Sequence, residues 1–340
     1  MTLRAERKST TVALPFPRPD AYSLAEALEP RLAVERHFAS IGHTYRHGRL
    51  YRKFEHRITR PLLKSALCLA GLYSRGIRNA VSPVVRHLFI AFEDLPAKLE
   101  GFTLLHLSDF HIDGVPGLAD ALSPLLSDLR PDLCVLTGDY RFEDQGACEP
   151  VYPLMRQLIG SIQARHGIYG ILGNHDDSEI AHELEEMGVR MLVNEAVEIQ
   201  ANSASFWLAG VDDPFDFRCH DLTRALAQVP PDAFQILLAH APEIYEQAAQ
   251  SGVDLYLSGH THAGQIRLPW VGAVRHNAHC PREYAYGLWR HGGMRGYTSA
   301  GIGCSSLPIR FGCPPEAVMI ELRRSSYGRG SETLFNRARE

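Results

Sequence analysis

The chain has 340 residues, of which 45% are hydrophobic and 22% charged, so it can bury one large core or two smaller ones. Its net charge is −4, but residues 1–90 hold 16 Lys and Arg against six Asp and Glu, whereas the remainder holds 19 against 33. Because an acidic body repels a phosphate backbone unless metal ions intervene, the charge gives no signal for nucleic-acid binding. Seven scattered cysteines without a C-x-x-C pair indicate neither a disulfide framework nor a zinc ribbon and favour a reducing, cytoplasmic location.

The first 95 residues divide into two segments. Residues 1–20 contain three prolines and no apolar period, which predicts a flexible lead. Residues 21–95 repeat aliphatic side chains at spacings of three and four among arginines, which predicts a basic helical segment. Its most apolar stretch, "SALCLAGLYS" at 65–74, is about half as long as a membrane-spanning helix requires. We therefore expect neither a secretory leader nor a transmembrane span.

Residues 45–92 within this segment interleave arginines with aromatic and aliphatic side chains. A basic amphipathic stretch of this kind can lie in an anionic membrane surface, where each cation contributes about 1 kcal/mol. The alternative is a helical appendage that packs its apolar face on the acidic body. Both interpretations stay open here. Membrane docking would place the protein on the cytosolic face of the inner membrane and would favour a lipid-linked substrate.

From residue 100 to residue 322, short apolar runs alternate with helical stretches, which is typical of βαβ units and an α/β fold. The runs predict strands at 103–107, 133–137, 168–172, 206–210, 234–239 and 253–257. Residues 323–340 are polar and predict a disordered tail.

Five of these predicted strands end in side chains that can bind metals. In chain order the ends carry Asp109 and His111, then Asp139, then Asn174, His175 and Asp176, then His240, and finally His260 and His262. A single histidine or Gly-Asp pair after a strand is more often a turn or a core residue. Because the carboxyl ends of strands in an α/β sheet share one edge, five such ends in succession favour a common site.

The residue types at these ends indicate the class of metal. Two carboxylates, one amide oxygen and four imidazoles suit manganese, iron or zinc, and they contain too much nitrogen for a magnesium or calcium cage. Seven side chains exceed what one ion with an open position needs, whereas two ions about 3.5–4 Å apart that share a carboxylate would use them all. We therefore expect two divalent cations, with manganese ahead of iron or zinc.

The five motifs, D-x-H, GD, GNHD, H and GHTH in this order, resemble those of the calcineurin-like metallophosphoesterases. The resemblance covers residues 102–322 and implies a two-sheet αββα sandwich with a dinuclear metal site. It assigns all seven ligands: Asp109, His111 and His262 to the first metal, Asn174, His240 and His260 to the second, and Asp139 to both. It also implies that His175 meets the phosphate and the leaving group, and that Asp176 orients the imidazole of His175.

Two later stretches, "GHTHAGQIRLPW" and "YTSAGIGCSSLPIRFGCPPEAVMIEL", resemble a bacterial branch related to UDP-2,3-diacylglucosamine pyrophosphohydrolases and membrane-associated phosphodiesterases. The expected function is a dinuclear-metal phosphohydrolase, in which a metal-bridging hydroxide cleaves a phosphodiester or pyrophosphate bond. The substrate would be lipid- or nucleotide-linked, such as UDP-2,3-diacylglucosamine.

Two alternative functions stay open. One is a phosphoesterase for soluble small molecules or nucleic acids, and the other is a non-catalytic binding scaffold. Arg141, just after Gly138-Asp139, is interpreted either as a contact for a second phosphate or as an exposed surface arginine. The sequence indicates no protein partner.

Overall fold

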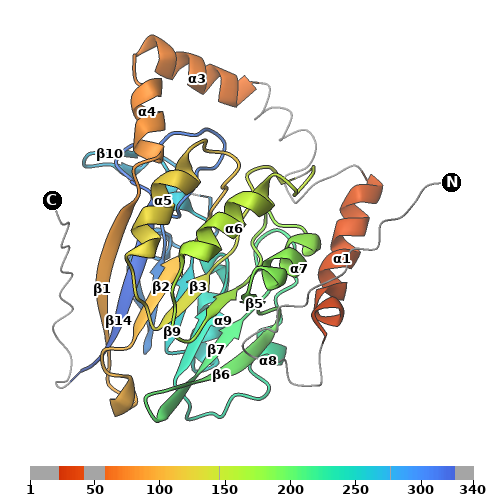
Figure 1. The fold of residues 1–340 in the computed structure, drawn as a ribbon, viewed down its shortest axis with the longest axis vertical. Helices are drawn as coiled ribbons and strands as arrows, with labels where there is room; N and C mark the ends of the chain where they lie inside the picture. Colours follow the sequence, from red (N-terminus) through yellow and green to blue (C-terminus); the bar gives the residue numbers. More distant parts are fainter. Residues whose placement is uncertain (1–22, 42–57, 145, 276, 326–340) are drawn as a thin grey trace.

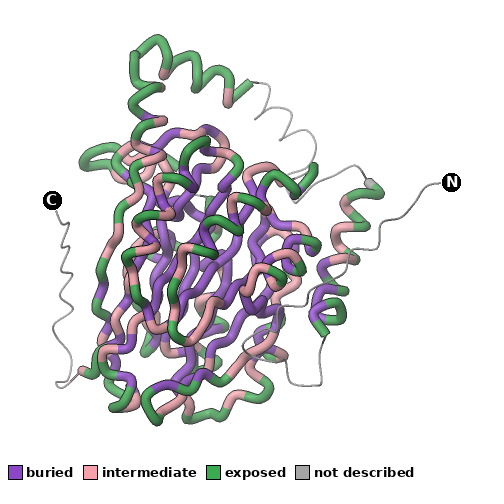
Figure 2. Tube along the Cα trace, viewed as in Figure 1, coloured by how far each residue is buried: buried purple, intermediate pink, exposed green. Residues whose placement is uncertain are grey.

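The computed structural model describes residues 23–41, 58–144, 146–275 and 277–325. Two six-stranded sheets enclose a hydrophobic core, and helices pack on the outer faces (Figure 1). Buried residues concentrate in the strands, as Figure 2 shows. This αββα sandwich confirms the expected fold class.

The first sheet joins strands from both ends of the described chain. Its spatial order is β1 (Val84–Phe92), β14 (Glu316–Arg324), β2 (Thr103–Leu107), β3 (Leu133–Leu136), β4 (Ile168–Gly170) and β5 (Val189–Met191). Strands β2 to β5 run parallel, while β14 is antiparallel to β2 and parallel to β1. Because both faces of this sheet are covered, β3 is buried along its whole length and its sequence is a continuous apolar run.

The second sheet has parallel central strands and antiparallel edges. Its spatial order is β12 (Gly287–His291), β13 (Met294–Thr298), β9 (Leu255–Ser258), β8 (Gln235–Leu238), β7 (Ala204–Gly210) and β6 (Glu195–Ala201). A small separate hairpin consists of β10 (Arg267–Leu268) and β11 (Gly272–Ala273). All six strands predicted from apolar runs are present, as β2, β3, β4, β7, β8 and β9.

Helices cover both sheets. The first sheet packs against α5 (Leu118–Ser127), α6 (Val151–Ser161) and α7 (Ser178–Glu186), and the second against α8 (Leu222–Ala225) and α9 (Tyr245–Gln250). Short 3-10 helices are η2 (Ala97–Leu99), η3 (Pro242–Ile244), η4 (His262–Gly264) and η5 (Arg282–Tyr284). The N-terminal segment adds α1 (Leu24–Ile41), α3 (Arg60–Leu69) and α4 (Tyr73–Ala80).

The prediction that residues 21–95 are helical is wrong for Val84–Phe92, which form edge strand β1. Leu88, Ile90 and Phe92 alternate along this strand and enter the core between the sheets. The buried residues of this segment therefore repeat every two positions. The prediction failed because aliphatic residues mixed with arginine and histidine also fit a helical spacing of three or four. The sandwich begins at residue 84 instead of residue 100.

The N-terminal helices differ in how they contact the sandwich. Leu24, Ala27 and Leu28 of α1 join the core cluster shared with α5, α6 and α7, so this helix, which lies before residues 45–92, packs on the sandwich. In contrast, α3 buries no side chain. Among the described residues, no helix combines the length and the apolar character needed to cross a bilayer.

Parts of the predicted terminal segments lie outside the described residues. These parts are the lead at 1–20, residues 42–57 of the basic segment, and 326–340 of the tail. The tail prediction is wrong for Arg323 and Arg324, because both residues belong to β14.

Candidate metal centre

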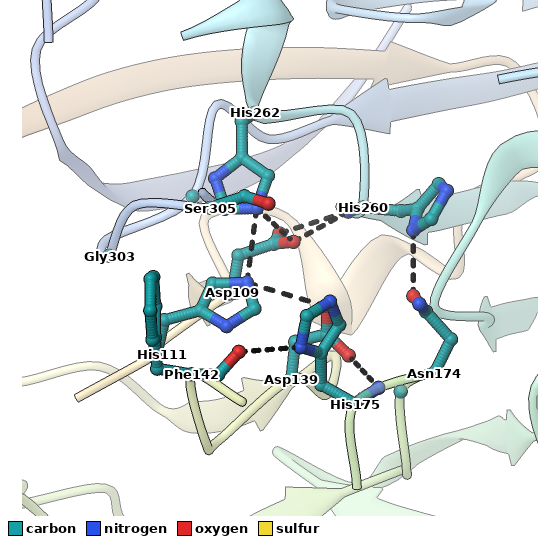
Figure 3. A network of polar contacts seen from close by, with 12 residues as sticks. Asp109, His111, Asp139, Phe142, Asn174, His175, His260, His262, Gly303 and Ser305 are labelled. Carbon is teal, nitrogen blue, oxygen red and sulfur yellow. Dashed lines mark hydrogen bonds and ion pairs between the residues drawn. The ribbon is translucent and has the colours of Figure 1, made fainter. Parts of the chain in front are cut away.

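The five predicted strand ends meet at one place on the sandwich. Strands β2, β3 and β4 of the first sheet and β8 and β9 of the second sheet all direct their carboxyl ends there. The structure therefore brings together all seven predicted ligands, which form two adjacent groups of side chains able to hold a metal ion. Figure 3 labels all of them except His240.

Asp109, His111 and His262 form the first group, and their ligand atoms lie within 4.8 Å of one another. Nε2 of His111 lies 3.1 Å from Nε2 of His262, and the latter atom lies 3.3 Å from Oδ1 of Asp109. Oδ2 of Asp139 lies 3.5 Å from Nε2 of His111. Asp139 therefore borders the first group through His111.

Asp139, His240 and His260 form the second group. Nε2 of His240 lies 3.3 Å from Oδ2 of Asp139 and 3.0 Å from Oδ1 of Asn174. Nδ1 of His260 lies 2.9 Å from the same Asn174 oxygen. Oδ2 of Asp139 thus faces ligand atoms of both groups, which is the position expected of a bridging carboxylate.

The backbone is strained where it carries these side chains. Five predicted ligands have a positive φ: Asp109 (51°), His111 (37°), Asp139 (57°), His260 (69°) and His262 (50°). This conformation costs a non-glycine residue about 1–3 kcal/mol and is concentrated at functional sites. Close backbone packing accompanies the strain, because a Cβ atom on Gly259 would lie 2.1 Å from Oδ2 of Asp109.

Hydrogen bonds determine which nitrogen of each ring faces the site. Nδ1 of His111 donates to the carbonyl of Arg141 at 2.7 Å, and Nδ1 of His240 donates to the carbonyl of Thr137 at 2.7 Å. In a neutral imidazole, Nε2 then carries the lone pair that a cation binds. The tautomers of both rings are therefore suited to metal binding through Nε2.

Burial keeps three of the rings neutral. It lowers the pKa of His111 to about 3 and holds the pKa values of His260 and His262 well below their ordinary range. These rings therefore offer lone pairs without competition from protons at neutral pH.

His240 behaves differently from the other three rings. Burial opposes its protonation, but the nearby Asp139 carboxylate raises its pKa to about 10. The pKa of Asp139 lies well below its ordinary range, against the effect of burial, because of His240. The proton between them would be displaced by a divalent cation.

The donor set of the whole site, which is rich in imidazole and has two carboxylates, fits borderline divalent metals.

His175 lies beside the ligands and is only half-buried. Its Nδ1 donates to the carbonyl of Phe142 at 2.7 Å, and its backbone N–H donates to Oδ1 of Asp139 at 2.8 Å (Figure 3). Burial opposes protonation of the ring, yet Asp139, Asp144 and the Phe142 carbonyl together raise its pKa above the ordinary value. A raised imidazole pKa suits a general acid. His175 also forms a third ligand-type group with His111 and Asp139, so its role stays a prediction.

Asp176 has a different role from the one expected. Its carboxylate accepts hydrogen bonds of 2.8 Å from the backbone N–H groups of Asp139, Tyr140 and Gly173. The prediction that Asp176 orients the His175 imidazole is wrong, because a backbone carbonyl holds that ring. Asp176 instead fixes the loop after β3 to the loop after β4.

Arg141 is 2% exposed, so its interpretation as a surface arginine is wrong. Its guanidinium forms an ion pair with Asp177 and donates to the carbonyl of Glu143 at 2.6 Å. Contact with a second phosphate stays a prediction.

Sequence reasoning missed a sixth strand end at this site. Strand β7 is followed by Asp212, Asp213 and Asp216, and Asp216 accepts a hydrogen bond of 3.0 Å from Nδ2 of Asn174. The stretch "FWLAGVDDPFDF" carries the same signal as the other ends, an apolar run followed by carboxylates. Arg310 was also missed, and no local pattern marks it, although its Nη2 lies 3.4 Å from Nδ1 of His262.

Comparison with known proteins identifies the family. Residues 102–264 match the calcineurin-like phosphoesterase family. Phosphodiesterase YaeI of Escherichia coli (strain K12) is 30% identical over 249 residues, which cover 70% of this chain and 87% of that protein. The chain belongs to the calcineurin-like phosphoesterase family.

Two further relatives are named as metallophosphoesterases. Uncharacterized metallophosphoesterase YkuE of Bacillus subtilis (strain 168) is 28% identical over 242 residues, covering 68% of this chain and 82% of that protein. A transmembrane protein with metallophosphoesterase domain from Bos taurus is 31% identical over 274 residues, covering 73% of this chain and 59% of that protein. As a calcineurin-like phosphoesterase, the protein is a metal-dependent phosphoester hydrolase that acts on phosphorylated substrates, as the sequence predicted.

Proposed function

We propose that the protein hydrolyses phosphodiester or pyrophosphate bonds at a dinuclear site formed by the seven ligands described above. The observation that carries this proposal is the position of Asp139, whose Oδ2 lies 3.5 Å from Nε2 of His111 and 3.3 Å from Nε2 of His240. A carboxylate between two sets of donors can join two cations. The nitrogen-rich donors support manganese, with iron or zinc as alternatives.

In this proposal the side chains hold the site and supply a proton. When bound, two divalent cations neutralise phosphate oxygens and lower the pKa of a water molecule. His175 would protonate the departing oxygen, because the Phe142 carbonyl holds its Nδ1 and leaves Nε2 for the transferable proton. The ligands are buried, whereas His175 is partly exposed and can meet the substrate.

A panel of substrates tests this function. The full-length protein with Mn²⁺ should be compared on bis-p-nitrophenyl phosphate, p-nitrophenyl phosphate, cyclic AMP and UDP-2,3-diacylglucosamine. A higher kcat/KM on the diester than on the monoester supports the proposal, and the opposite order contradicts it. Preference for cyclic AMP over UDP-2,3-diacylglucosamine would favour a soluble phosphoesterase. No turnover of any substrate by the metal-loaded protein would favour a binding scaffold.

We further propose that the substrate is lipid-linked and that the protein docks on an anionic membrane at the cytosolic face of the inner membrane. Helix α3 supports this proposal, because it buries no side chain and Leu69 is 91% exposed. The hairpin β10–β11 also projects apolar residues, namely Leu268, Val271, Val274 and the fully exposed Trp270. Aliphatic and tryptophan side chains of this kind enter the interfacial region of a bilayer.

Helix α4, which follows α3 in the chain, and the hairpin attach to the same part of the sandwich. The backbone N–H of Arg310 donates to Gly76 of α4 at 3.1 Å, and the N–H of Arg267 in β10 donates to Phe311 at 2.8 Å. Both elements lie at the same end of the molecule in Figure 1. Exposed cations there include Lys64 on α3, which can contact anionic headgroups. The hairpin follows His262 closely in the chain, so a docked membrane would lie near the metal centre.

Vesicle binding tests the membrane proposal. The protein should co-sediment with vesicles that contain phosphatidylglycerol at low salt, dissociate as salt rises, and ignore phosphatidylcholine vesicles. The Leu69→Ser/Trp270→Ser variant should lose this binding, while Phe89→Ser, which changes an exposed apolar residue on β1, should retain it. Absence of binding to anionic vesicles at low salt would remove the membrane role and favour the soluble alternative.

A further inference from the structure

Arg31 on α1 is a fully buried guanidinium that contacts the loop after β4. Its Nη2 donates to the carbonyls of Gly173 and Asp176, at 2.7 and 2.5 Å. These carbonyls stand at the two ends of the four-residue loop that carries Asn174 and His175. One side chain from the N-terminal segment therefore fixes both ends of the loop that bears a predicted ligand and the predicted general acid.

The same guanidinium fixes a second loop, which follows β7. Its Nη1 forms an ion pair with Asp212, which is 1% exposed, and its guanidinium carbon lies 3.7 Å from the centre of the Phe217 ring. Asp213 closes this loop by accepting the backbone N–H groups of Asp216 and Phe217, at 2.7 and 2.8 Å.

This second loop contacts two predicted ligands of the second metal group. Asp216 accepts a hydrogen bond from Nδ2 of Asn174 at 3.0 Å, which turns Oδ1 of that amide toward the site. The ring of Phe215 lies 4.1 Å from the ring of His260. Arg31 is thus the shared contact of the loop that carries Asn174 and the loop whose Asp216 orients its amide.

We propose that Arg31 is a positioning residue for the second metal group and for His175, and that α1 acts on the metal centre through it. This inference rests on the ligand assignment proposed above. The hydrogen bonds of Arg31 reach none of the described loops that carry Asp109, His111 and His262. Loss of Arg31 should therefore affect the two metal positions unequally, whereas a purely structural role would affect both or neither.

Two variants and one control separate these roles. Arg31→Lys keeps the positive charge near Asp212, but an ammonium group lacks the planar fork that reaches several acceptors at once. Arg31→Met/Asp212→Asn removes both members of the buried ion pair, so neither charge is left unpaired. The control is Arg36→Met on the same helix, where the Arg36 side chain is 69% exposed and lies 3.8 Å from Glu29.

The metal-free full-length proteins should be titrated with Mn²⁺ by calorimetry, which needs no substrate. We expect two equivalents to bind the native protein and the control. In both Arg31 variants, one equivalent should keep its affinity and the other should bind about 10–100-fold more weakly. At saturating Mn²⁺, kcat should fall in both variants because His175 is displaced.

Equal weakening of both equivalents, or two equivalents with native affinity and unchanged kcat, would overturn the proposal. If the double variant does not fold, Arg31→Lys decides the question by the same criteria. A native protein that fails to bind two equivalents would refute the ligand assignment, and this inference with it. If the native protein binds two equivalents of Mn²⁺ and the Arg31 variants match it in affinity and kcat, only the role of Arg31 would be refuted.

Discussion

The carboxylate of Asp216 accepts a 3.0 Å hydrogen bond from Nδ2 of Asn174, and this bond determines which end of the amide faces the metal centre. An amide side chain can present either its oxygen or its nitrogen, but only the oxygen can bind a cation. Oδ1 of Asn174 accordingly lies 3.0 Å from Nε2 of His240 and 2.9 Å from Nδ1 of His260. A residue outside the predicted ligand set therefore decides whether one of those ligands is usable.

Replacing Asp216 by alanine should weaken one metal equivalent by about 10–100-fold, because the Asn174 amide loses the partner that orients it. The titration with Mn²⁺ described for Arg31 measures this effect. Asp232→Ala, which removes an exposed carboxylate, serves as the control and should leave both equivalents unchanged. Native affinity for both equivalents in Asp216→Ala would show that the amide needs no such support.

Replacing Asp139 by asparagine should abolish tight binding of both metals, because one carboxylate oxygen faces both groups. Asparagine is preferable to alanine here, since it tolerates the φ of 57° at this position. Its oxygen can also keep the 2.8 Å hydrogen bond from the backbone of His175. The exposed Asp128→Ala is a suitable control. If Asp139→Asn still binds two equivalents tightly, the bridging role is wrong.

Replacing His175 by alanine should preserve both metal equivalents and lower kcat by about 10²–10⁴-fold, the usual contribution of a general acid. The loss should be greater for a phenyl ester than for a p-nitrophenyl ester, because the poorer leaving group depends more on protonation. Metal content and kcat for the two esters provide the measurement. Loss of a metal equivalent would instead identify His175 as a ligand, as its position beside His111 and Asp139 allows.

Glu243 should make the stability of the protein depend on pH. Burial raises the pKa of Glu243 to about 7, and its Oε2 has no hydrogen-bond partner among the described residues. Between its ordinary value near 4.5 and about 7, the folded protein holds a proton that the unfolded chain has lost. The free energy of unfolding should therefore fall as pH rises through this window.

The variant Glu243→Gln should lack this fall, and above the window it should exceed the native protein in stability by an amount on the order of 3 kcal/mol. Urea denaturation at about pH 5 and about pH 8 measures the difference. Glu246→Gln, on the neighbouring helix α9, provides the matched control. Parallel pH profiles for Glu243→Gln and the native protein would contradict the prediction.

The strand ends could be predicted because their signals are local. Each is a short apolar run that stops at a glycine or a polar residue. The run must be buried and its end exposed, so the pattern is visible within a few residues of sequence. The sandwich and the seven ligands followed from the order of these motifs through their resemblance to a known family. The same local signal was present after β7, where Asp212, Asp213 and Asp216 were missed.

Local patterns failed where two periods fit the same residues or where partners are distant. Val84–Phe92 satisfied a helical spacing, and only pairing with β14 made this segment a strand. The family resemblance predicts that Asp176 orients the imidazole of His175, but the packing of the two loops places three backbone N–H groups around its carboxylate.

The sequence by itself therefore determined the residue types, their order and the strand ends that carry them, because these depend on hydrophobic runs and turn chemistry over a few positions. Only the tertiary structure decided that Oδ2 of Asp139 faces both ligand groups. It also decided that Arg31 contacts the loop of Asn174 through Gly173, which lies 142 residues later in the chain. Such contacts depend on how helices and sheets pack, and one arginine among many in a basic segment carries no local mark of its burial.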